Sequence, residues 1–145
     1  MRAVIQRVRS AWIEVEGARV AEIGRGLLVL LGIDKDDGME QAKRLAKRCV
    51  NIRIFEDLEG RMNRSLLDIT GEILVVSQFT LVADTKKGNR PSFSSALRPE
   101  KAKILYDCFL SALSSSGREP KSGIFGAKML VRIENDGPVT FILEA

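Results

Sequence analysis

The sequence predicts an α+β fold in which two main helices pack on a mostly antiparallel curved sheet or barrel. Several short segments alternate apolar and polar residues at the two-residue period of a half-buried strand, as residues 11–15 and 18–23 do. Two longer segments repeat apolar residues three and four positions apart, which is the period of a helix buried along one side. A length of 145 residues with 45% hydrophobic content suits one domain, residues 1–145, with its own core.

The expected strands are short and end at turn residues; they cover residues 3–8, 11–15, 18–23, 27–31, 52–55, 73–76, 129–133 and 139–143. Glu16 and Gly17 separate the second strand from the third and predict a hairpin. The run from Leu27 to Leu31 is apolar throughout, so we expect that strand to be covered on both faces.

The first helix is expected to begin near Met39, with Asp36 and Asp37 as candidate capping residues. Its polar face carries four basic side chains, at Lys43, Arg44, Lys47 and Arg48. Such a face is most often simply solvated, and contact with nucleic-acid phosphates is the alternative. The second helix is expected to begin at residues 98–100, where Pro99 occupies the first turn.

The composition restricts the chemistry that the chain can perform. It contains no histidine, which excludes the usual general base and the Ser-His and Cys-His nucleophile pairs. We expect no metal site and no cofactor. Cys49 and Cys108 lie among apolar neighbours and are expected to be buried free thiols. The net charge of +4 permits an anionic partner without requiring one.

The apolar stretches are short. None approaches the roughly 20 residues of a membrane span, and no apolar segment of a secretory signal follows the first residues. We therefore expect no membrane association and a cytoplasmic location.

Ser77, Gln78, Phe79 and Thr80 place two hydroxyls and an amide at the end of a buried strand. The plain interpretation is a strand that ends in a loop, with the hydroxyls bonded to local backbone groups. If Thr80 acts as a nucleophile, Asp84 and Lys86 are the nearest candidate bases, and neither is a strong one.

Two further segments allow a plain and a functional interpretation. Asp136-Gly137 suits a tight turn, and Pro138 removes a ladder donor at the start of the last strand, so the sequence by itself favours an ordinary turn with a trans proline. Residues 85–90 place three positive charges around a glycine, and such a loop is either solvated or wraps phosphates.

A set of motifs that spans essentially the whole chain resembles the D-aminoacyl-tRNA deacylases. The motifs are Gln6-Arg7-Val8, residues 26–32, Arg53-Ile54-Phe55, residues 75–81, Arg90-Pro91-Ser92-Phe93, residues 123–127 and residues 135–140. Each motif alone is weak evidence, whereas together and in the family order they are highly specific. No motif position departs from the pattern.

The resemblance implies an enzyme that hydrolyses the ester between tRNA and a D-amino acid, or glycine, and rejects the L-form. It also implies a homodimer with two sites at the subunit interface. One wall of each site would be formed by Ser77, Gln78, Phe79 and Thr80. Gly137 and Pro138, joined by a cis peptide, would enter from the other subunit as a chiral filter.

Two other residues receive supporting roles from the resemblance. Arg7 would hold the Gly137-Pro138 loop in place. Phe125 would help Phe79 to shape the pocket around the aminoacyl-adenosine end of the substrate. These roles, like those of the two walls, remain expectations at the level of the sequence.

Two mechanisms are open for this chemistry. Thr80 could attack the ester, or the ribose 2′-hydroxyl and a positioned water could act while backbone amides near Phe79 and Thr80 bind the oxyanion. We favour the second mechanism because Thr80 has no clear base. A non-catalytic RNA-binding module and a structural subunit, whose interface is its purpose, are the other functions considered.

Overall fold

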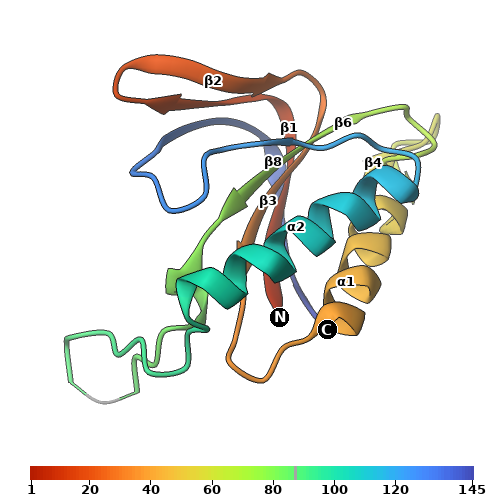
Figure 1. Cartoon of the computed structure of the whole chain (residues 1–145). Helices are drawn as coiled ribbons and strands as arrows, with labels where there is room; N and C mark the ends of the chain where they lie inside the picture. The colour runs from red at the N-terminus through yellow and green to blue at the C-terminus, as the bar shows by residue number, and fades with distance from the viewer. Residues whose placement is uncertain (87) are drawn as a thin grey trace.

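The computed structural model describes residues 1–86 and 88–145 (Figure 1). Two helices, α1 (Met39–Asn51) and α2 (Pro99–Ser115), accompany a curved six-stranded sheet and a small two-stranded one. The large sheet contains β1 (Arg2–Val15), β2 (Ala18–Ile23), β3 (Gly26–Gly32), β6 (Glu72–Ser77), β7 (Lys121–Ser122) and β8 (Leu130–Glu144). The small sheet pairs β4 (Phe55–Glu56) with β5 (Met62–Arg64). This confirms the predicted α+β class.

The long strand β1 is the centre of the sheet. Its first half pairs with β3, its second half pairs with β2, and β8 pairs with it along nearly its whole length, in each case antiparallel. The sequence predicted two strands here, because the alternation of apolar residues is interrupted between residues 8 and 11. The predicted hairpin is confirmed: Val15 pairs with Ala18, and Glu16 adopts a positive φ of 51° beside Gly17.

The middle of the sheet is parallel, which the sequence did not indicate. β3 pairs with β6, and β6 pairs with β7, in the parallel sense. As predicted, β3 is covered on both faces: Leu27 and Val29 belong to the core under the helices, and Leu28 belongs to a second core on the other face. β3 approaches β6 so closely that a Cβ on Gly26 would stand 1.8 Å from the carbonyl oxygen of Glu72.

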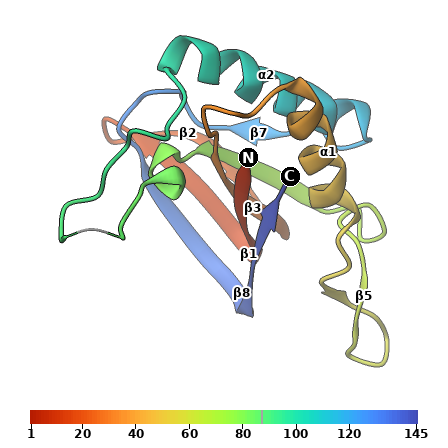
Figure 2. The ribbon, with the colours of Figure 1, turned by 90° about the horizontal axis from the view of Figure 1, so that it is seen from below.

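The two helices lie together on one side of the sheet, while β8 runs along the side away from α2 (Figure 2). Their buried faces are those that the helical periodicity predicted; in α1 they are Ala42, Leu45, Ala46, Cys49 and Val50. Neither of these helices, the only ones of more than four residues in the described ranges, is long and apolar enough to cross a membrane.

The prediction that Asp36 or Asp37 caps α1 is wrong. Gly38 is the N-cap residue, and its amide donates to Oε1 of Gln41 at 3.1 Å. Asp37 is occupied elsewhere, because its carboxylate pairs with the terminal ammonium of Met1 and accepts the amide of Asp34. A partner 36 residues away in the sequence has therefore taken the side chain that local spacing assigned to the cap.

The predicted turn at residues 135–138 is also wrong. The two strands expected on either side of it form one continuous strand, β8, and both halves pair with β1. The segment is a bulge inside this strand. A further expected strand, residues 52–55, is shorter than predicted, because Ile52 ends α1 and only Phe55–Glu56 is extended and paired.

The remaining expectations concern the two cysteines and the basic loop. Cys49 is buried, as predicted, and burial raises the pKa of its thiol to about 12; Cys108 is only partly buried. The loop expected at residues 85–91 contains Lys87, which lies outside the described residues; its other residues form neither helix nor strand.

Candidate active site

A pocket of about 630 Å³ opens where the carboxyl end of β6 meets the start of α2. Four of the predicted site residues line it, namely Ser77, Gln78, Phe79 and Phe125. Most of the remaining lining is apolar: Leu31, Ile33, Val76, Phe93, Ala96, Leu97, Pro99, Ala102, Ala127, Met129 and Val131. Its volume and mixed lining suit a ligand of nucleoside size or somewhat larger.

The polar wall follows from the way β6 ends. The strand is buried up to Val76, and the chain then turns at Gln78, whose amide donates to the carbonyl of Leu31 at 2.8 Å. A short 3-10 helix, η1 (Phe79–Val82), begins directly afterwards. The first amides of a helix have no acceptor within it. The backbone N–H groups of Phe79 and Thr80 are therefore available at the edge of the pocket.

Aromatic rings form the apolar part of the pocket. The ring of Phe79, which is 57% exposed, lies 5.1 Å from that of Phe93, and Phe125 lies 5.5 Å from Tyr106 of α2, measured between ring centroids. The hydroxyl of Tyr106 donates to the carbonyl of Val75 at 3.0 Å. Burial raises the pKa of Tyr106 to about 12, opposed by a hydrogen bond with Ser122, so this residue stays neutral and fixes Phe125 against β6.

Thr80 lies beside the pocket without a base. Its Oγ accepts a hydrogen bond from Nε2 of Gln78 at 2.5 Å. The two candidate bases in the sequence are elsewhere: the carboxylate of Asp84 accepts the amide of Lys86 at 2.9 Å, and both residues line a different pocket. The hydroxyl of Thr80 is therefore held by an amide donor rather than by a group that removes its proton.

The Gly137–Pro138 peptide is cis, as the resemblance implied, and the ordinary turn with a trans proline that the residues alone favoured is not formed. Gln6 of β1 pairs with Thr140 and Val8 pairs with Asn135, so the single residue Arg7 lies opposite four residues of β8, 136–139. The amide of Asn135 closes the base of this bulge by donating to the carbonyls of Arg7 at 3.1 Å and Val139 at 3.3 Å. A Cβ on Gly137 would stand 2.1 Å from Oδ1 of Asn135, so only glycine fits there.

Arg7 is the buried support of this bulge. Its guanidinium donates to the carbonyl of Asp136 at 3.0 Å and to the carbonyl of Ile54 at 2.8 Å. It also pairs with the carboxylates of Asp136 at 3.1 Å and Glu56 at 3.4 Å. Each of the three guanidinium nitrogens therefore has an acceptor, and together they connect the backbone of the bulge with residues 54 and 56 in and beside the strand β4.

Within one chain, the predicted residues fall into two separate groups. Ser77, Gln78, Phe79 and Phe125 line the pocket, with Thr80 next to it, whereas neither Gly137, Pro138 nor Arg7 is part of its lining. Gly137 and Pro138 are instead exposed on β8. The two groups therefore do not share one pocket within the described part of a single chain.

Several lining residues were not singled out by the sequence. Phe93 belongs to a motif that was noticed but given no role, and Met129 and Val131 come from the start of β8. Arg98, just before α2, was noted only as a helix start. Apolar residues in a pocket wall have the same pattern as core residues, so only a charged member such as Arg98 carried a usable signal.

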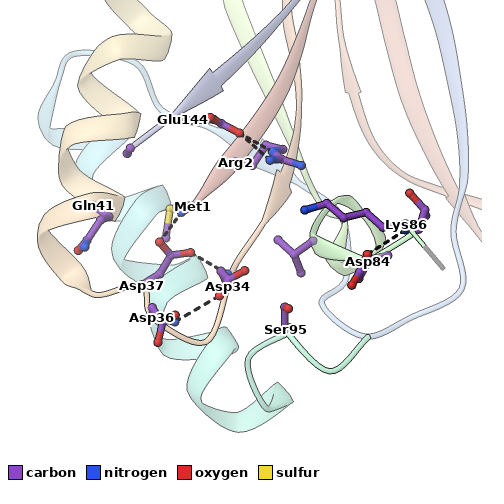
Figure 3. Close-up of a pocket in the computed structure, with 14 residues that line it drawn as sticks. Met1, Arg2, Asp34, Asp36, Asp37, Gln41, Asp84, Lys86, Ser95 and Glu144 are labelled. Carbon is purple, nitrogen blue, oxygen red and sulfur yellow. Dashed lines mark hydrogen bonds and ion pairs between the residues drawn. The ribbon is translucent and has the colours of Figure 1, made fainter. Parts of the chain in front are cut away.

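A second pocket, of about 810 Å³, lies near the two chain ends and contains none of the predicted site residues (Figure 3). Five carboxylate residues line it, Asp34, Asp36, Asp37, Asp84 and Glu144, against the cations of Met1, Arg2 and Lys86. An excess of carboxylates repels phosphates. For a nucleic-acid ligand the pocket beside Phe79 is therefore the better candidate.

Taken together, the fold and the pocket define a small α+β protein with a largely apolar pocket, one end of which carries the side-chain amide of Gln78 and the hydroxyl of Ser77. The family described as D-Tyr-tRNA(Tyr) deacylase matches residues 4–144. A D-aminoacyl-tRNA deacylase of Thermosipho africanus (strain TCF52B) is 54% identical over 145 residues, which cover 100% of this chain and 97% of the relative. One of Aquifex aeolicus (strain VF5) is 53% identical, with 100% and 98% covered.

Solved structures agree with this assignment. One described as c-Myc DNA Unwinding Element Binding Protein superposes with a TM-score of 0.95 at 43% identity, over 100% of this chain and 99% of that chain. Another, described as the structural analysis of a probable eukaryotic D-amino acid tRNA deacylase, has a TM-score of 0.84 at 20% identity over 99% and 98%, which shows the fold alone. The chain belongs to the D-Tyr-tRNA(Tyr) deacylase family, as its motifs predicted.

The role of Arg7 can be tested by replacing it with lysine. Lysine keeps the charge but cannot reach the carbonyls of both Ile54 and Asp136, so a buried acceptor loses its donor. We expect Arg7→Lys to lower the free energy of unfolding by about 1–3 kcal/mol, measured by urea denaturation. Arg9→Lys is the matched control, because Arg9 pairs with the same Asp136 but is exposed; its effect should stay below about 0.5 kcal/mol. Equal effects of the two variants would contradict the supporting role.

Proposed function

We propose that this protein is a D-aminoacyl-tRNA deacylase that releases a D-amino acid from tRNA. The observation that carries the proposal is the pocket formed by Ser77, Gln78 and Phe79 in a chain that belongs to the D-Tyr-tRNA(Tyr) deacylase family. The rings of Phe79, Phe93 and Phe125 offer surfaces for stacking a terminal base. The polar end of the pocket then receives the ester.

The active form in this proposal is a homodimer. In the described part of the chain, β8 pairs with β1 alone, and it exposes large apolar side chains, among them Leu130 at 52% and Ile142 at 65%. An unpaired strand edge with exposed apolar residues is a typical surface for a second chain. The exposed Gly137-Pro138 bulge lies on the same strand, so a dimer formed there brings the bulge of one copy toward the pocket of the other.

The bulge acts as the chiral filter. An enzyme that accepts many side chains must recognise the groups that all amino acids share and reject the wrong hand by a clash. Backbone carbonyls of the bulge bind the amino group of a D-amino acid or glycine, while an L side chain is driven against the wall. Arg7 and Asn135 hold these carbonyls in place, since both bond to the backbone of residues 136–139.

The chemistry is hydrolysis without a protein nucleophile. A positioned water adds to the ester carbonyl, the bond from the carbonyl carbon to the ribose oxygen breaks, and the proton goes to that oxygen. The neighbouring ribose 2′-hydroxyl assists this transfer, and the amides of Phe79 and Thr80 bind the oxyanion. An ester of a ribose is reactive enough for positioning and oxyanion binding to supply much of the rate. Because its substrate is charged tRNA, the enzyme acts in the cytoplasm.

A second candidate is nucleic-acid binding without cleavage. It rests on the neighbour at 43% identity that is described as a DNA-element binding protein, and on the exposed basic residues of α1. This function predicts salt-sensitive binding of tRNA with no release of the amino acid. Measuring the release of the amino acid from aminoacyl-tRNA separates the two functions.

The proposed activity predicts stereospecific release. The purified protein should hydrolyse D-tyrosyl-tRNA and glycyl-tRNA, and leave L-tyrosyl-tRNA nearly untouched, when each is labelled in the amino acid and free label is counted over time. Release of the D- and L-forms at equal rates would refute the filter. No release at all, with tRNA still bound, would establish the binding function instead.

The mechanism predicts that Thr80 is dispensable for bond breaking. Thr80→Ala removes a hydroxyl that accepts a hydrogen bond from Gln78 and has no base, so we expect kcat on D-tyrosyl-tRNA to fall by about tenfold or less. Thr85→Ala, in the neighbouring loop, is the control for the loss of an exposed threonine hydroxyl. A loss of 10⁴-fold or more in a folded Thr80→Ala protein would identify Thr80 as the nucleophile.

The filter predicts that Pro138→Ala reduces the ratio of D- to L-rates more than it reduces stability, whereas Pro120→Ala, away from the bulge, changes neither.

A mixed dimer tests whether the filter acts across subunits. One chain carries Pro138→Ala, and the other carries Ala127→Trp, which fills its own pocket. The remaining open pocket then faces an intact Pro138 and should stay selective. An unselective mixed dimer would mean that each chain filters its own pocket.

A further inference from the structure

Arg98 is the only charged residue among those that line the pocket beside Phe79 in the described ranges. The rest of the lining is apolar, aromatic or neutral and polar. A single cation on a wall of this kind suggests a ligand with a negative charge, because a neutral ligand would leave the cation without an ion-pair partner. Arg98 is the N-cap residue of α2 and is exposed.

The side chain of Arg98 is free to take a ligand. Among the described residues it forms no ion pair and no side-chain hydrogen bond, although its own carbonyl accepts the amide of Ala102 at 2.9 Å. The side chain of Arg98 is exposed. The guanidinium of Arg7, by contrast, is buried and donates to the carbonyls of Asp136 and Ile54. Arg98 therefore has no evident structural task.

The charge of the substrate matches this single cation. The terminal adenosine of a tRNA is neutral apart from the phosphate that joins its 5′-oxygen to the preceding nucleotide. When the base and the ester occupy an apolar pocket, that phosphate must remain at the pocket wall or mouth. An arginine fork can bind two phosphate oxygens at once.

We propose that Arg98 binds the 5′-phosphate of the terminal adenosine of the substrate and so sets how deeply the aminoacyl ester enters the pocket. This inference rests on the proposed function and adds a phosphate subsite to it. It makes Arg98 a positioning residue, because it binds the phosphate on the 5′-oxygen of the ribose and does not touch the ester on the other side of the same ribose. The pocket interior needs no charge of its own.

The basic face of α1 is a poorer place for this contact. Lys43 of that face already pairs with Glu40 at 2.8 Å, and Arg48 donates to the carbonyl of Glu144. Both views show α1 on the side of the fold away from the start of α2 (Figures 1 and 2). A phosphate next to the pocket therefore meets Arg98, and α1 can meet only more distant parts of the tRNA.

The experiment compares three esters of D-tyrosine: those of adenosine, of adenosine 5′-monophosphate and of tRNA. Arg98→Gln removes the cation, and we expect kcat/KM to fall about tenfold for the two substrates that carry the phosphate, mainly through KM. The adenosine ester lacks the phosphate, so its kcat/KM should not change. For the tRNA ester, the slope of log(kcat/KM) against log[salt] should become shallower by about one. Arg98→Lys should restore part of the loss.

Two results would overturn the subsite. A loss of equal size on the adenosine ester would mean that Arg98 only shapes the pocket, and no loss on either phosphate-bearing ester would mean that it makes no contact. Arg44→Gln, a matched loss of one exposed charge on α1, should leave both small esters unchanged. An equal loss with Arg44→Gln on the monophosphate ester would reduce the effect to net charge. If the wild-type protein cleaves none of the three esters, the proposed function itself is refuted.

Discussion

The guanidinium of Arg7 is the contact on which the shape of the β8 bulge depends. A sheet normally matches one residue with one residue, whereas here a single residue of β1 faces four of β8. Three residues of β8 are therefore in excess, and the backbone groups of the bulge lose their ladder partners and need other donors and acceptors. The guanidinium of Arg7 donates to the carbonyl of Asp136. The side-chain amide of Asn135 donates to the carbonyls of Val139 and Arg7. Rigid presentation of Gly137 and Pro138 follows from these two side chains.

The remaining site is built by a different device. The pocket wall forms because β6 is buried up to Val76 and the chain then turns over the end of β3 into η1. Tyr106, itself buried and bonded to Val75, holds Phe125 from the side of α2. The two halves of the proposed site are thus anchored in different parts of the sheet. In the proposed dimer the two halves of one site come from different chains.

This arrangement explains why the absence of histidine is compatible with catalysis. Besides Arg98, the polar side chains of the pocket lining are the amide of Gln78 and the hydroxyl of Ser77, with the hydroxyl of Thr80 beside the pocket, and none of these groups takes a proton readily. In the proposed mechanism such a set binds and orients an ester and stabilises an oxyanion, and the proton transfers are left to water and the ribose. In the proposal for Arg98, this residue, the single cation that lines the pocket in the described part of the chain, serves recognition rather than bond breaking. In the proposed mechanism, both the selectivity and the rate therefore depend on how the substrate is positioned in the site.

Some local predictions succeeded because they depend on neighbours in the sequence. The helical faces, the hairpin at Glu16-Gly17 and the doubly covered strand β3 follow from the periodicity of apolar residues. Others failed where a distant partner decided the outcome. Asp37 pairs with the terminal ammonium rather than capping α1, and β6 pairs in parallel with β3, which no local pattern encodes.

The sequence by itself determined the α+β class, the two helices, the residues of the polar wall and, through its ordered motifs, the family. Only the tertiary structure decided that residues 136–139 form a bulge in one continuous strand, since the alternation of the flanking strands is the same for a hairpin and for one interrupted strand. It also confirmed the cis proline that the resemblance implied. It also decided that this bulge and the pocket are separate within one chain, and that Arg98 is the one charged residue in the pocket wall among the residues that the structure describes. Both facts depend on distances between residues far apart in the sequence, and local propensity carries no information about such distances.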